Sequence, residues 1–534
     1  MKKNRIGYCA LASMLLLASC QEDFKDEDQP TISITSPAAG QKVWLETPLS
    51  VEASDEQGVS KVAFYLNDEL VGEDTEAPYE WMLNTQEYED GDYVLRTVAH
   101  DGTGNQTEVE QEIEVFNNLL KVEVEEGYHK DNNLRQWVIV SNAEGSVLQT
   151  EELKNGTTAI FGRPEGFNES FSVTLLSIDE RSNDDYWTFA TTYTGATPDH
   201  WVMPSSTNGE ERMVLGTATG SFITPDGNYR VSSPNGTFYS TSNIYYEDGK
   251  QTEFSFDTYE NPAQLYVAAL PYQQAPQYAS LKNIQPEGHY ELTADDMVPM
   301  KVHKTINLPS VNDALMLVRG HYEGDEGYHT ASRSYWDELT NQLPVYLPEG
   351  VFNDFTYSLD ADLGDFSYYR SDNGSMPDSY DIPALAPGII HSAQFGDFSA
   401  SVDGQYDYAH ASWFDYDEEQ SVSLMAWSVL GSSDEELQWT VSDLPKEINE
   451  LYPFLPARMN EMQFVRLQVV NRDNIASYEE YLATLNKVQD EVVKVHEAVS
   501  LKADEHQNSR KRTVELPAHV RHWIGQLEKV HRLQ

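Results

Sequence analysis

Hydrophobic and polar residues alternate over short stretches between residues 30 and 117, which is typical of half-buried strands. In one stretch, Val62, Phe64 and Leu66 occupy alternate positions and therefore share one face. Turn-forming residues such as Asn67 and Asp68 separate this stretch from the next. The spacing corresponds to about seven short strands, which predicts a β-sandwich over residues 30–117.

The β pattern continues through most of the remaining chain. A hairpin is expected where the turn Asn142–Gly145 follows Trp137–Val140, and the polar stretch Ser205–Arg212 is typical of a domain boundary. There is no fixed repeat period, which disfavours propellers and solenoids. The sequence therefore predicts a mainly β protein built from tandem β-sandwich domains, with a C-terminal helix and a short tail. Beyond the first sandwich, the predicted segments are a small β-sandwich at 118–204 and β domains at 205–310 and 311–472.

The pattern changes near the C-terminus. Ser477 and Glu480 have the spacing of a capping box, and apolar residues then recur every three or four positions from Tyr478 to Val499. We expect an amphipathic helix within 473–506 that docks on a β domain. The segment after Leu501, which includes the predicted tail at 507–534, has seven basic and four acidic residues. This tail could fold back onto acidic neighbours in the same chain. Alternatively, it could contact lipid phosphates or an acidic partner.

The N-terminus has the pattern of an export signal. Lys2, Lys3 and Arg5 precede an apolar stretch from Leu11 to Ala18 that is too short to span a bilayer as a helix. The sequence Leu17-Ala18-Ser19-Cys20 resembles the bacterial lipobox. The resemblance implies a signal peptide at 1–19, cleavage between Ser19 and Cys20, and lipidation of Cys20. An outer-membrane lipid would then be one partner of the mature protein.

An acidic tether is expected at residues 20–29, because this stretch is charged and lacks apolar periodicity. It resembles the export signal of Bacteroidetes-type surface lipoproteins, which implies a location facing the cell exterior; a plain solvated spacer is the alternative. The chain has two cysteines. If Cys9 is removed with the signal and Cys20 is lipidated, no thiol remains for catalysis, disulfide formation or zinc binding.

The first predicted sandwich also carries a family resemblance. Ile34–Gly40, Val62–Asp68 and Gly91–Asp101 resemble the bacterial Ig-like modules of secreted glycan-active enzymes and adhesins. The resemblance implies a spacer or an interaction platform without catalytic residues. Asn142–Phe161 resembles transthyretin-like regulatory modules, which would apply to the segment 118–204.

The net charge restricts the class of partner. The chain has 88 Asp and Glu residues against 35 Lys and Arg, a formal net charge of −53. Nucleic-acid binding requires clustered basic residues, so DNA and RNA are not expected partners. The hydrophobic fraction of 40% is too high for a disordered acidic chain.

Motifs for catalysis are missing from the sequence: there is no zinc-protease motif, nucleophile elbow, phosphate-binding loop or dinucleotide fingerprint. The abundance of acids makes any single pair of carboxylates uninformative about glycoside hydrolysis. Asp360, Asp362 and Asp365 lie close to a glycine, in a pattern that resembles part of a calcium-binding loop. Ca²⁺ is therefore the one candidate cofactor. A solvated turn is the alternative.

Aromatic residues beside acidic residues provide the candidate ligand contacts. Sugar rings stack on exposed aromatic faces, and carboxylates accept hydrogen bonds from hydroxyl groups. Core packing is the alternative role for such rings in a β-sandwich. The candidate residues are Tyr335, Trp336, Trp413, Phe414 and Tyr416.

Together these features predict a lipid-anchored outer-membrane protein, facing the cell exterior, that binds a ligand and catalyses no reaction. The ligand would be a polysaccharide, a component of the cell envelope or a membrane-protein partner. Two alternatives remain open: a glycan-active hydrolase with an unrecognised carboxylate pair, and a structural subunit of a surface complex.

Overall fold

The computed structural model describes residues 28–501, except for 130–132, 182–185, 206–212, 224–226, 233–243, 247–250, 271–274, 324–328, 417–423, 435 and 486–492. The chain divides into two compact units, residues 1–117 and 118–534. The predicted signal peptide, most of the acidic tether and the C-terminal tail lie outside the described residues. No helix in the described part of the chain has both the length and the apolar character needed to cross a bilayer.

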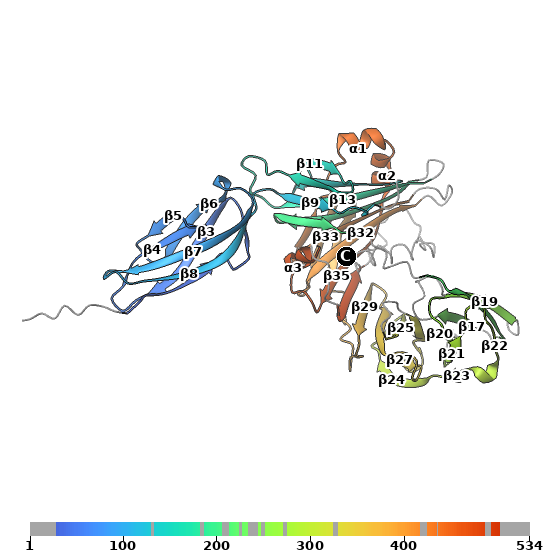
Figure 1. Ribbon diagram of the computed structural model, residues 1–534. Coiled ribbons are helices and arrows are strands. Elements are labelled where there is room, and N and C mark those ends of the chain that lie inside the picture. The colour runs from blue at the N-terminus through green and yellow to red at the C-terminus, as the bar shows by residue number, and fades with distance from the viewer. Residues whose placement is uncertain are drawn as a thin grey trace, which may run out of the picture. The chain divides into compact units, whose positions relative to one another are not determined.

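The first unit is the β-sandwich that the alternating pattern predicts (Figure 1). Inward-facing side chains from both of its sheets, including Leu49, Phe64 and Leu95, form one core in which each is almost fully buried. One sheet has the strand order β1 (Thr31–Ser36), β3 (Glu46–Ser54), β6 (Tyr79–Asn84); the other has the order β2 (Lys42–Val43), β8 (Gln106–Val115), β7 (Gly91–Asp101), β4 (Val59–Leu66), β5 (Glu69–Asp74).

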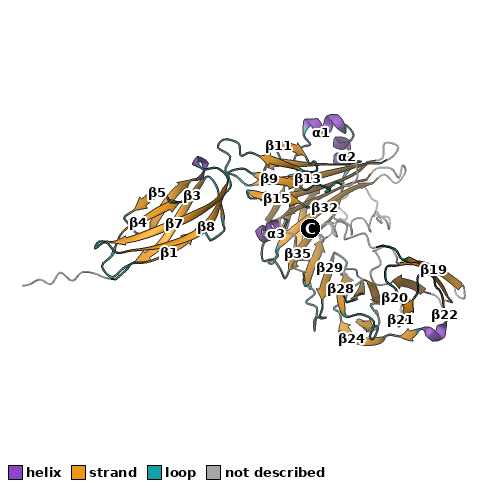
Figure 2. Ribbon diagram, in the orientation of Figure 1, coloured by secondary structure: helices purple, strands orange, loops and turns teal. Residues whose placement is uncertain are grey.

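A twelve-stranded sheet organises the described part of the second unit (Figure 2). Its strand order is β11 (Val147–Glu152), β10 (Leu134–Asn142), β13 (Phe171–Glu180), β14 (Tyr186–Ala196), β33 (Leu424–Gly431), β32 (Tyr408–Tyr416), β35 (Gln463–Arg472), β36 (Val495–Leu501), β29 (Phe366–Asn373), β28 (Asp354–Asp362), β25 (Asp313–His321), β26 (His329–Tyr335). Of the described residues, 60% lie in strands and 6% in helices, which confirms the predicted mainly β fold class.

The large sheet crosses three of the predicted domain boundaries, those after residues 204, 310 and 472. β14 pairs in parallel with β33, from Trp187 opposite Leu424 to Tyr193 opposite Leu430. Strands from the predicted segments 118–204 and 311–472 therefore belong to one sheet, and the boundaries between these segments do not separate two sheets. Because this pairing joins strands that are far apart in sequence, local alternation contains no signal for it.

Smaller elements cover both faces of the large sheet. One face packs against β30 (Gly388–Gln394), β31 (Asp397–Val402) and β34 (Glu436–Trp439), against β24 (Lys301–Asn307) and β27 (Gln342–Leu347), and against helices α1 (Lys446–Leu451) and α2 (Leu455–Glu461). On the other face, β9 (Leu120–Val124), β12 (Thr157–Phe161) and β15 (Asp199–Met203) pack over β10, β13 and β14. Helix α3 (Tyr478–Thr484) packs on the same face against β32 and β33. The main core lies on the first of these faces.

Two further sheets lie within the segment predicted as a β domain at 205–310. They pack together through Phe254, Phe256, Leu265 and Val267. Their strand orders are β19 (Gln251–Thr258), β16 (Gly216–Ile223), β22 (His289–Leu292) and β18 (Ile244–Tyr246), β17 (Gly227–Ser232), β20 (Ala263–Leu270), β21 (Gln277–Ile284), β23 (Val298–Pro299).

The predicted helix within 473–506 is wrong in its extent. Helix α3 starts as expected, because the Ser477 hydroxyl oxygen accepts a hydrogen bond from the Glu480 N–H at 3.2 Å. The helix ends at Thr484, and the residues from Val495 to Leu501 form strand β36 between β35 and β29. β-Branched valines favour a strand, and here the strand can pair with a neighbour on each side. This preference for a strand outweighs the helix signal that comes from the spacing of the valines.

Candidate functional site

Four side chains form a row across the polar face of the large sheet. The strand registers place Tyr335 of β26 opposite Leu315 of β25, Leu315 opposite Asp360 of β28, and Asp360 opposite Tyr369 of β29. Because paired residues point to the same side of a sheet, all four side chains lie on one face, and we call them the tyrosine row. Asp360 is exposed, and the other three residues are half-buried.

A second row lies beside the first on the same face. The registers place Arg333 opposite Leu317, Leu317 opposite Ser358, Ser358 opposite Ser371, and Ser371 opposite His496. We call these residues the arginine row. The Ser358 and Ser371 hydroxyls are 3.2 Å apart, which is hydrogen-bonding distance.

The two rows are in contact at β29 and β36, and Arg319 of β25 contacts the arginine row from the same face. The Arg319 Nη1 donates a hydrogen bond to the Ser358 hydroxyl at 3.1 Å. The Tyr369 and His496 rings meet edge to face with their centroids 5.8 Å apart. This face therefore combines aromatic rings, hydroxyl groups, a carboxylate and guanidinium groups, which are the chemical groups that recognise a polar ligand with apolar patches.

Further polar contacts hold the strands of this face together. The His321 Nε2 lies 2.9 Å from the Thr356 hydroxyl, which donates a hydrogen bond to the Asn373 Oδ1 at 2.6 Å. The Asn373 amide nitrogen donates to the carbonyl oxygen of Val493 at 2.6 Å. These contacts connect β25, β28 and β29 with the segment that enters β36.

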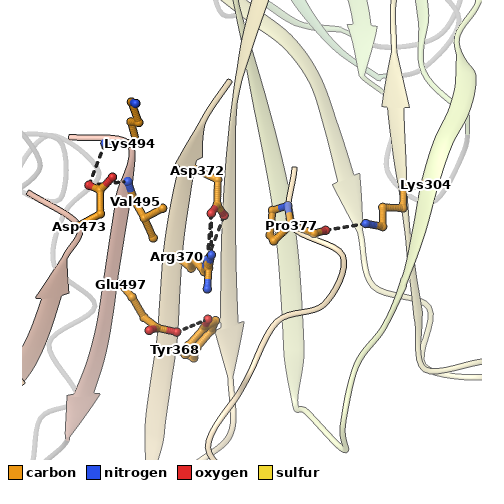
Figure 3. A network of polar contacts seen from close by, with 9 residues as sticks. All are labelled: Lys304, Tyr368, Arg370, Asp372, Pro377, Asp473, Lys494, Val495 and Glu497. Carbon is orange, nitrogen blue, oxygen red and sulfur yellow. Dashed lines mark hydrogen bonds and ion pairs between the residues drawn. The ribbon is translucent and has the colours of Figure 1, made fainter. Parts of the chain in front are cut away.

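A buried polar network lies on the opposite face of β29 and β36 (Figure 3). The Tyr368 hydroxyl donates to the Glu497 Oε1 at 2.5 Å, and burial raises the pKa of this tyrosine. The Arg370 guanidinium donates to the Asp372 carboxylate, with the shortest N–O distance 2.8 Å. The hydrogen bond to Asp372 raises the pKa of Arg370. Asp372 is only 3% exposed, so this network holds two strands together rather than contacting a ligand.

Two more contacts in the same view fix the surroundings of these strands (Figure 3). The Asp473 carboxylate accepts hydrogen bonds from the backbone N–H groups of Lys494 and Val495, both at 3.0 Å, at the start of β36. The Lys304 ammonium of β24 donates to the carbonyl oxygen of Pro377 at 2.6 Å. These contacts fix the start of β36 and the segment that follows β29, which helps to pre-organise this end of the polar face.

The structure corrects the role of two aromatic candidates. Trp413 is 1% exposed and Phe414 is 6% exposed, so neither ring is accessible to a ligand. The Trp413 indole N–H donates to the carbonyl oxygen of Ala393 at 2.9 Å, as expected of a tryptophan in a core. Trp336 packs partly buried against the main core, and the side chain of Tyr416 lies outside the described residues. Among the described candidates, Tyr335 is the one that lies on the polar face.

The acidic candidates lie at the edge of that face. Asp360 and Asp362 occupy alternate positions of β28, and Asp365 lies in the turn before β29. The Asp362 Oδ1 accepts a hydrogen bond from the Gly364 N–H at 2.8 Å, which closes the turn. Within the described ranges, no three His, Cys, Asp or Glu side chains form a group suited to hold a metal ion. Calcium binding at these aspartates stays a prediction.

Sequence reasoning did not single out Tyr369, Arg333, Arg319 or His496. The alternation in Asp354–Asp362 assigns Asp360 to one side of its strand. It does not reveal which strands flank β28, and so it cannot bring Tyr369 and Tyr335 into one row. That information comes from pairing between strands that are distant in the sequence.

The comparisons identify the first unit. Residues 30–96 match the family model of the bacterial Ig domain. This segment is a bacterial Ig domain. The match ends before β8, although β8 pairs with β7 along its whole length and completes the sandwich. No curated protein matches the sequence.

Several solved structures resemble parts of the chain. The fibronectin(III)-like modules of Clostridium thermocellum CbhA are 31% identical, cover 16% of this chain and 94% of their own, and have a TM-score of 0.15. The SGBP-B protein of the Bacteroides ovatus mixed-linkage glucan utilization locus, in complex with a heptasaccharide, is 11% identical, with coverages of 61% and 93% and a TM-score of 0.16. The endo-β-1,4-mannanase of Thermotoga petrophila is 17% identical over 17% of this chain and 20% of its own, with a TM-score of 0.15. TM-scores this low do not support conclusions about the function of this chain.

Proposed function

We propose that the protein is a non-catalytic surface protein that binds a polysaccharide on the polar face of its large sheet. The tyrosine row is the observation that carries the proposal. Its two aromatic rings lie on β26 and β29, and its carboxylate lies on β28. All three groups point to the same side of four neighbouring strands. A bacterial Ig domain in the first unit agrees with a binding role, because such modules serve as spacers or interaction platforms.

The dimensions of the row suit a chain of sugar units. Tyr335 and Tyr369 are three strand spacings apart, or about 14 Å between backbones. The apolar faces of sugar rings stack on tyrosine rings, and the Asp360 carboxylate between the two tyrosines is an acceptor for sugar hydroxyl groups. The Leu315 side chain fills the remaining position of the row and provides apolar contact.

Binding of the chain from Gln21 onward to a panel of neutral and acidic polysaccharides tests the proposal. Affinity electrophoresis and calorimetry would show binding, and Tyr335→Ala and Tyr369→Ala should each weaken it about tenfold, because each removes one stacking platform. Tyr259→Ala, in the turn after β19, is the matched control and should leave binding unchanged. Absence of binding to every polymer, or equal binding by all variants, contradicts the proposal. Release of reducing sugar would favour the hydrolase alternative.

We also propose that Cys20 carries the lipid that anchors the protein to the outer membrane, with the folded units facing the cell exterior. The lipobox-like ending of the N-terminal segment supports this proposal. Mass spectrometry of the membrane-extracted protein should find a lipid on Cys20, and Cys20→Ala should release the protein from the membrane fraction. External protease applied to intact cells tests the orientation. An unmodified Cys20 contradicts the anchor.

A further inference from the structure

Arg333 differs from other arginines of the molecule in its surroundings. It lies on the polar face, is half-buried, and has no ion-pair or hydrogen-bond partner among the described residues. Two other guanidinium groups are paired with acids: Arg135 with Glu152 at 2.7 Å, and Arg370 with Asp372 at 2.8 Å. A chain with 88 acidic residues offers many internal counter-ions, yet none of the described carboxylates pairs with Arg333.

A second guanidinium group lies close to the first on the same face. Arg319 is two residues from Leu317, and Leu317 is the residue opposite Arg333. A register shift follows Val318, so that Arg319 pairs with Thr330, three residues from Arg333 along β26. The hydrogen bond from Arg319 to the Ser358 hydroxyl orients its guanidinium on the face. Two guanidinium groups therefore lie on the same face of β25 and β26.

The half-buried guanidinium of Arg333 suits an anionic ligand better than a neutral one. Removing part of the hydration of a guanidinium is unfavourable unless an anion replaces it. The planar guanidinium binds a carboxylate or a sulfate through two parallel hydrogen bonds. We propose that the polar face binds an acidic glycan, and that Arg333 binds the carboxylate or sulfate group of this glycan. This inference rests on the proposed function and names its ligand class.

Tyr335 lies close to Arg333 on the same strand. Arg333 and Tyr335 are two residues apart on β26, so their side chains point to the same side, about 7 Å apart. A sugar ring stacked on Tyr335 therefore places one substituent over Arg333. Asp360, across Leu315 from Tyr335, repels an acidic group at its own position. The acidic group of the bound sugar is thus directed toward Arg333 and away from Asp360.

Pairs of polymers that differ only in charge test this inference. The chain from Gln21 onward, which contains both folded units, is titrated with polygalacturonate and its methyl ester, and with a sulfated galactan and its desulfated form. We expect one charged polymer to bind at least about tenfold more tightly than its neutral counterpart, and added salt to weaken this binding. The polymer that binds distinguishes carboxylate from sulfate recognition.

Variants at Arg333 assign the effect to this residue. Arg333→Gln should weaken binding of the charged polymer about 10- to 100-fold, because it removes a charged, two-pronged hydrogen bond. Arg333→Lys should recover part of the loss, since it keeps the charge without the planar group. Lys446→Gln on α1 changes the net charge by the same amount and should have no effect. Unfolding in urea verifies that each variant is folded.

The possible outcomes separate this inference from the proposed function. If neutral and charged polymers bind equally, or if Arg333→Gln binds as the unaltered chain does, acidic recognition by Arg333 is wrong while glycan binding stands. If no polymer binds, both proposals are wrong.

Discussion

Two arginines on neighbouring parts of one sheet illustrate how surroundings decide the role of a residue. Arg370 faces the covered side and is paired with a carboxylate that is almost fully buried. Arg333 faces the polar side without such a partner among the described residues. The first therefore contributes to the stability of the sheet, and the second remains able to bind an external anion.

Replacement of Asp372 by Ala tests the structural role of the first pair. This substitution leaves the Arg370 charge partly buried without its partner, so the free energy of unfolding should fall by about 3 kcal/mol. Urea denaturation followed by circular dichroism measures the change. Replacing both residues, as in Arg370→Met with Asp372→Leu, should cost less than Asp372→Ala alone, because no unpaired charge remains. A larger loss in the double variant would contradict this account.

At the scale of single elements, the sequence predicted local features well and pairing partners poorly. Alternation identified strands such as Val62–Leu66, and the Ser477 cap marked the start of α3. The helix was predicted too long because valines spaced three and four apart fit a helix and a strand alike. Trp413 was a candidate ligand contact because it lies near acidic residues in the sequence, whereas strands distant in sequence bury it. Tyr335 and Asp360 were selected individually, but their common row depends on β25 lying between them.

The cap of α3 gives a prediction for one element. Ser477→Ala removes the acceptor for the Glu480 N–H and should lower the stability of this region by about 1 kcal/mol. Hydrogen exchange of the peptide that spans Tyr478–Thr484 should accelerate. Ser477→Asp keeps a side-chain acceptor at the cap and serves as the control, with exchange close to that of the unaltered chain. Equal acceleration in both variants would show that the cap does not stabilise α3.

At the scale of the whole molecule, the two compact units have separate hydrophobic cores. Phe64 is fully buried in the core of the first unit, and Phe64→Ala should destabilise that unit by about 3–5 kcal/mol. Scanning calorimetry should then show one transition moved to lower temperature and the transition of the second unit unchanged. Leu70→Ala, at a half-exposed position of β5, is a control and should move neither transition. A shift of both transitions in Phe64→Ala would show that the units unfold together.

The place of β36 has a consequence for how the protein is made. It is the last described strand in the sequence, yet it pairs with β35 on one side and β29 on the other. During synthesis from the N-terminus, the two halves of the large sheet thus have no strand to join them at this point until residue 501 is available. The Ig domain contains all of its own strands and has no such requirement. We expect the nascent chain to complete the Ig domain before the large sheet, which cannot close around β36 until that strand has been synthesised.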